Sequence, residues 1–181
     1  MKSCGPRGLG VVSFIILLMS GACTRPAEEP RPGLLMLEFE LIDEMRDLYP
    51  DYQPASELRR LKQIGAQLRA EFEKNNFYRM LDSTRTAEAI KPVRDNYNYL
   101  HDCNGCEVDL ARGLGAERVL TGWVQKVSNL ILNINIEIKD TESGNTVVRK
   151  SVDIRGNTDI SWQRGIAFII RDMLEKRQGG K

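Results

Sequence analysis

Apolar and polar positions alternate most clearly in residues 130–139. Leucine or isoleucine occupies every even position from Leu130 to Ile138, and asparagine, glutamate and lysine occupy most of the odd ones. A period of two predicts a strand with one buried and one wetter side. Shorter apolar runs predict further strands at residues 34–40, 77–81, 119–127 and 146–154.

A helical period marks two longer segments. The first is a stripe that predicts a helix of about five turns, formed by Leu58, Leu61, Ile64, Leu68 and Phe72. We expect the Ser56 hydroxyl to cap it by accepting a free first-turn N–H. The second stripe predicts the last helix, formed by Trp162, Ile166, Ile169, Ile170 and Met173. Thr158 or Asp159 is its expected cap.

Two shorter helices are predicted at residues 84–91, closed by Pro92, and at residues 106–114. The resulting order is β-α-β-α-α-β-β-β-α. It predicts one α/β domain over residues 33–176, with about five strands in a mixed sheet and helices packed on it. The last three strands are expected to form a meander, and residues 177–181 a frayed tail.

The first 32 residues have the pattern of a targeting signal followed by a linker. Residues 1–22 combine Lys2 and Arg7 with a short apolar run, and they read as a signal peptide that is removed. Small residues ending directly at Cys23 resemble a bacterial lipobox, although Ser20 stands where leucine is usual. We expect Cys23 to be lipidated, with ordinary secretion or an uncleaved anchor as alternatives. Residues 23–32 are rich in proline and read as a tether.

Removal of the signal peptide changes the charge and cysteine counts. The full chain has a net charge of +1, and loss of Lys2 and Arg7 makes it −1. No large basic surface is expected, which argues against a nucleic-acid partner. Three cysteines remain, so lipidation of Cys23 would leave one pair. The expected location is the periplasm, on the outer membrane, because Thr24 rather than aspartate follows the cysteine.

The cysteine pair lies in the motif Cys103-Asn104-Gly105-Cys106. A structural disulfide is the favoured interpretation, because nearby thiols are usually oxidised in the periplasm. Thiol–disulfide catalysis is an alternative, but no buried strand leads into the motif, and Asp102 and Glu107 beside the cysteines would disfavour a thiolate. A metal site built from His101, Cys103 and Cys106, with Asp102 or Glu107 nearby, is the third possibility.

The polar stretch 153–159 holds the candidate binding residues, which are Asp153, Arg155, Asn157 and Asp159. A loop at a helix start can hold an anion, and a simple turn is the other interpretation. We expect Asp153 to pair with Arg155 or Arg149. Glu38 and Glu40 are expected to face solvent. The sequence predicts no catalytic constellation and no cofactor.

Three stretches resemble a family of bacterial secreted proteins of unknown function over roughly residues 34–175. They are CNGCE at 103–107, GWVQKVSNLILN at 122–133 and DIRGNTDISW at 153–162. Residues 111–124 are similar to a helix–strand passage of the TolB amino-terminal and curli-secretion lipoprotein domains, which implies a periplasmic α/β module. The expected function is therefore an envelope accessory or binding module with an unidentified protein partner. A thiol–disulfide redox protein is the alternative.

Overall fold

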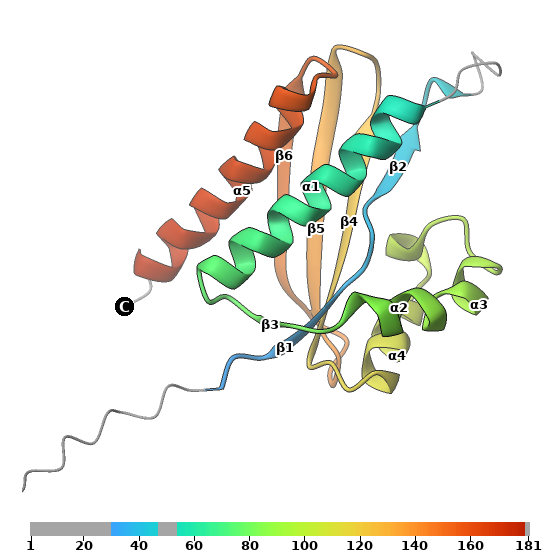
Figure 1. Ribbon diagram of the computed structural model, residues 1–181, viewed down its shortest axis with the longest axis vertical. Coiled ribbons are helices and arrows are strands. Elements are labelled where there is room, and N and C mark those ends of the chain that lie inside the picture. Colours follow the sequence, from blue (N-terminus) through green and yellow to red (C-terminus); the bar gives the residue numbers. More distant parts are fainter. Residues whose placement is uncertain (1–29, 47–53, 180–181) are drawn as a thin grey trace, which may run out of the picture.

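The computed structural model describes residues 30–46 and 54–179 (Figure 1). The expected signal peptide at residues 1–22, the lipidated Cys23 and most of the tether lie outside the described residues. Within the two described ranges, no helix is long and apolar enough to cross a membrane.

Over these ranges, strands and helices build one sheet with helical cover. The strands are β1 (Gly33–Met36), β2 (Glu40–Asp43), β3 (Arg79–Met80), β4 (Arg118–Lys126), β5 (Ile131–Asp140) and β6 (Thr146–Arg155). The helices are α1 (Ala55–Lys74), α2 (Ser83–Ala89), α3 (Lys91–Arg94), α4 (Cys106–Gly113) and α5 (Asp159–Gly179), with a short 3-10 helix, η2, at Leu100–Asp102.

The sheet is mixed, as the sequence predicts. Its order is β3-β1-β4-β5-β6, and β2 also pairs with β4. Strands β1 and β2 run parallel to β4, and β3 runs parallel to β1. Strands β4, β5 and β6 form the expected antiparallel meander. The sheet has six strands rather than about five, because the first predicted strand is divided into two.

The division of the first strand follows from the packing of Phe39. Strand β1 ends at Met36 and β2 begins at Glu40, so residues 34–40 do not form the single strand expected. The Phe39 side chain is buried over Gly122 of β4. A Cβ atom at position 122 would lie 2.6 Å from the Phe39 ring. The absence of a side chain at Gly122 therefore makes room for the ring.

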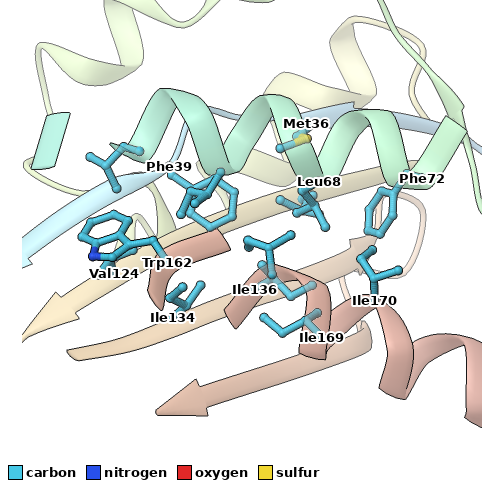
Figure 2. Packing of buried hydrophobic residues seen from close by; sticks show 14 of the residues in the cluster. Met36, Phe39, Leu68, Phe72, Val124, Ile134, Ile136, Trp162, Ile169 and Ile170 are labelled. Carbon is cyan, nitrogen blue, oxygen red and sulfur yellow. The ribbon is translucent and has the colours of Figure 1, made fainter. Parts of the chain in front are cut away.

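Two apolar clusters lie on opposite faces of the sheet. Helices α1 and α5 cover one face and enclose the larger cluster (Figures 1 and 2). Its labelled members are Met36, Phe39, Leu68, Phe72, Val124, Ile134, Ile136, Trp162, Ile169 and Ile170. The smaller cluster contains residues of α4, η2 and β1. Neighbouring residues of β4 separate the two, because Leu120 belongs to the larger cluster and Val119 to the smaller.

The alternating strand is confirmed with one change at its start. The Leu132, Ile134, Ile136 and Ile138 side chains are fully buried. Leu130, expected on the same buried side, is 61% exposed because it precedes β5 and lies in the connection from β4.

The first turn of α1 differs from the predicted stripe. Glu57 is fully buried there, whereas Leu58 is 50% exposed. Glu57 precedes Leu61 by four residues and Ile64 by seven, so it lies on the same face as the rest of the stripe. Ser56 is not the cap, because Pro54 occupies that position and the Ser56 hydroxyl donates to Glu57.

Three other ends differ from the expected boundaries. Only Arg79 and Met80 form β3, although residues 77–81 were predicted as a strand. Pro92 does not end a helix but lies in the first turn of α3, where its missing N–H costs nothing. Helix α5 continues to Gly179, so residues 177–179 are helical rather than frayed. At its start, the Ser161 N–H donates to the Thr158 hydroxyl, which confirms the expected cap.

Candidate functional site

The CNGC segment joins the end of η2 to the start of α4. Asn104 and Gly105 have φ angles of 55° and 108°, and asparagine and glycine tolerate this left-handed region best. The turn brings the sulfur atoms of Cys103 and Cys106 to disulfide-bonding distance, with the Cα atoms 5.5 Å apart. Cys103 is buried and Cys106 is half-buried.

A buried carboxylate lies directly against this disulfide. Glu107 is 1% exposed, and its Oε2 atom lies 3.1 Å from Cys103 Sγ. The Gly105 N–H donates to the same oxygen at 3.2 Å. The Lys139 ammonium donates to Oε1 at 2.6 Å from β5. Burial of a carboxylate is costly without such partners, so Lys139 and the backbone compensate its charge.

His101 is engaged elsewhere. Its Nδ1 atom lies 2.8 Å from Glu40 Oε2, and its ring stacks on Trp123 with centroids 4.4 Å apart. The Leu100 and His101 backbone N–H groups also donate to the Glu40 carboxylate. Glu40 therefore holds the start of η2 and does not face solvent as expected. Glu38, by contrast, is exposed and pairs with Arg94.

The possible metal ligands that lie together differ from the predicted set. Ligand atoms of Cys103, Cys106 and Glu107 lie within 4.8 Å of one another, and His101 is not part of this group. Lys139 brings a positive charge to Glu107 at 2.6 Å. A cation bound at the same carboxylate would be repelled by that ammonium. The geometry therefore favours a thiol or disulfide role for the pair.

A second polar cluster lies where β2, β4, α1 and the β6–α5 connection meet. Lys126 donates to Asp43 Oδ2 at 3.0 Å and to Glu57 Oε1 at 3.1 Å. All three side chains are at most 5% exposed. Asn157 Nδ2 donates to Glu57 Oε1 at 2.7 Å. The Trp162 Nε1–H donates to Asn157 Oδ1 at 3.0 Å. This cluster joins the two long helices to the end of the sheet.

The four candidate binding residues separate into two groups. Asn157 and Asp159 come together through Arg60, which donates to both side chains. Asp153 lies on the other side of the sheet, where it accepts from Asn133 at 2.6 Å instead of pairing with an arginine. Arg155 is exposed, and the described residues offer it no ion pair. The four residues therefore do not form a single anion site.

The arginines of α1 make Asp159 a stronger acid. Hydrogen bonds from Arg59 and Arg60 lower its pKa from 3.8 to about 2. A lowered folded-state pKa contributes stability above the unfolded value, and that contribution is lost as the pH falls through the folded value. The effect is modest, because the Asp159 side chain is 38% exposed and solvent screens it.

We therefore expect Asp159→Asn to lower the melting temperature at pH 7 by a small amount. The difference from the wild type should shrink as the pH falls from about 4 to about 2, because protonation of Asp159 then removes the same charge. Thermal unfolding across this range measures it, with Asp153→Asn as the matched control. A difference that stays constant down to pH 2 would contradict the assignment.

Several of these residues were not predicted as functional. The burial of Lys126 could have been predicted, because it follows Leu120, Gly122 and Val124 on the buried alternate positions of β4. The burial of Glu57 could have been predicted as well, because it lies four residues before Leu61. The pairing of Glu107 with Lys139 had no local signal, because the two residues are 32 positions apart.

Known proteins share the fold but little sequence. No curated protein matches the chain. The C-terminal domain of LpoB from Salmonella enterica is similar with a TM-score of 0.50 and 12% identity, over 71% of this chain and 86% of that one. Lipoprotein GNA1162 from Neisseria meningitidis gives a TM-score of 0.49 and 13% identity, over 81% and 96%. TolB from Acinetobacter baumannii gives 0.47 and 10%, over 83% and 29%.

The likeness to the LpoB domain shows the fold alone. A family assignment comes from the sequence, and it extends over nearly the whole described domain. Residues 33–174 match the family described as protein of unknown function (DUF2380), and the chain therefore belongs to that family.

Proposed function

We propose that this protein is an accessory or binding module of the cell envelope, held on the periplasmic side of the outer membrane by a lipid on Cys23. The cysteine arrangement carries the proposal. Cys103 and Cys106 lie at disulfide-bonding distance, so they account for each other. Cys23 is then the unpaired cysteine of the mature chain, directly after small residues and before the proline-rich tether.

The ion pairs around the β6–α5 connection support an accessory or binding module. The charged residues gathered at the second polar cluster compensate one another. Lys126 contacts both Asp43 and Glu57, and Asp159 is held by two arginines. Side chains used in this way fix helices to the sheet. The fold shared with the C-terminal domain of LpoB is compatible with such a module.

Labelling with palmitate tests the anchor in cells. We expect the full-length chain to incorporate the label and Cys23→Ala to lose it entirely. Cys4→Ala is the matched control, because Cys4 lies in the segment that is removed, and it should label like the wild type. Equal labelling of Cys23→Ala and the wild type would contradict the proposal.

A further inference from the structure

The two cysteines of the CNGC turn are not equivalent. Cys103 is 2% exposed, and its sulfur lies against the Glu107 carboxylate. Cys106 is half-buried and is the first residue of α4, where the helix N-terminus favours a thiolate. Cys106 is therefore the more accessible of the two cysteines to an external thiol.

Glu107 lies between the buried Cys103 sulfur and the partly exposed Lys139. The carboxylate itself is 1% exposed, but Lys139, which donates to its other oxygen, is 22% exposed. When the cysteines are reduced, the Cys103 thiol is placed to donate to Glu107 Oε2, because the two atoms are already 3.1 Å apart. That distance suits a proton transfer between the two groups.

We propose that Cys103 and Cys106 form an exchangeable disulfide, and that Glu107 moves the proton of Cys103 during exchange with a protein dithiol. The proposal goes beyond the envelope role and does not depend on the lipid anchor. The sequence alone argued against exchange, because Glu107 beside the cysteines would disfavour a thiolate. In the structure Glu107 contacts Cys103 rather than Cys106, and Lys139 compensates its charge.

Reduction of the disulfide begins at Cys106. A thiolate of the partner attacks Cys106 Sγ, the bond between the two cysteine sulfurs breaks, and its electron pair leaves on Cys103 Sγ. Glu107 relays a proton from water to that sulfur. The second partner thiol, as a thiolate, attacks the partner sulfur of the mixed disulfide and releases Cys106 as a thiolate, which takes a proton from water. The protein disulfide gains two electrons and two protons, and the partner dithiol becomes a disulfide.

Glu107 holds the Gly105 N–H of the turn, but that role alone does not require a carboxylate against the Cys103 sulfur. Removal of a carboxylate and its partner ammonium from water is unfavourable, and apolar residues of similar size are often as stable. A short CNGC ring also gains little from loop closure. The buried Glu107 is explained if its proton is needed at Cys103.

Thiol–disulfide exchange with dithiothreitol tests the role of Glu107. In one assay, the purified full-length chain is reduced with dithiothreitol at pH 7. In the other, the reduced chain is reoxidised with oxidised dithiothreitol at the same pH. The reaction is stopped with acid at successive times, and alkylation of the free thiols gives the rates of reduction and reoxidation. We expect Glu107→Gln to slow reoxidation by about tenfold or more, because the general base is lost. Glu137→Gln is the matched control, since Glu137 is also buried and lies near Lys139 but not at the disulfide. Its rate should stay within about twofold.

Two outcomes would overturn the proposal. One is a Glu107→Gln rate within twofold of the wild type, which would assign Glu107 a structural role only. A loosened fold does not imitate the expected result, because greater access to the sulfurs would speed exchange. The second measurement needs no variant: limiting iodoacetamide on the reduced wild type should label Cys106 at least tenfold more than Cys103. Equal labelling would remove the assigned order of attack.

Discussion

Replacement of Lys126 by methionine is expected to lower the free energy of unfolding by about 3–5 kcal/mol. Methionine has a similar length but no charge, so the Asp43 and Glu57 carboxylates would lose their shared buried cation. Removal of one partner from a buried ion cluster leaves uncompensated charge in a poorly solvated site. Denaturant unfolding followed by circular dichroism measures the change.

The control for this variant is Lys62→Met, which removes an exposed lysine from α1 and should change stability by less than about 0.5 kcal/mol. Adding Asp43→Asn and Glu57→Gln to Lys126→Met should recover part of the loss, since the two carboxylate charges that Lys126 balanced are then removed. A loss below about 1 kcal/mol for Lys126→Met would show that the cluster does not stabilise the fold.

Trp162→Ala should cost about 3–5 kcal/mol as well, through a different cause. Trp162 is fully buried among the residues of the larger cluster (Figure 2). Alanine would leave a cavity between α5 and the sheet, and it would remove the Nε1–H that donates to Asn157. Thermal and denaturant unfolding measure the loss.

Trp162→Phe separates the two contributions. It keeps most of the ring volume and removes the hydrogen bond, so its cost should be clearly smaller than that of alanine. An equal cost for the two variants would mean that the hydrogen bond to Asn157, and not packing, dominates at this position.

The parts of the fold that local patterns determine were predictable. The alternation of β5 and the apolar stripe of α5 are confirmed, because each depends only on the period of neighbouring residues. The prediction for the first turn of α1 was wrong, because a pattern of apolar residues favours burial of Leu58 over burial of Glu57. Glu57 is buried because Lys126, 69 residues away, provides its charge partner. Such a pairing has no local signature.

The candidate site shows the same division. The CNGC pairing was predictable from the spacing of the cysteines and the compartment expected from the sequence. The compensation of the Glu107 charge was not predictable, because its partner Lys139 lies on a strand 32 residues later. Glu40 was expected in solvent, yet it binds His101 and the start of η2, 60 residues away. The polar stretch 153–159 begins on β6 and ends on α5, so its residues face different partners.

Mass analysis of the mature amino terminus tests the central claim most directly. Both expected cleavages fall between Ala22 and Cys23, so position alone does not separate a lipoprotein from a secreted protein. The lipid does. We predict that the purified full-length product yields an amino-terminal peptide beginning at Cys23 and carrying the added mass of a diacylglycerol and an acyl chain. A peptide that begins at an unmodified Cys23, or one that retains residues 1–22, would contradict the account.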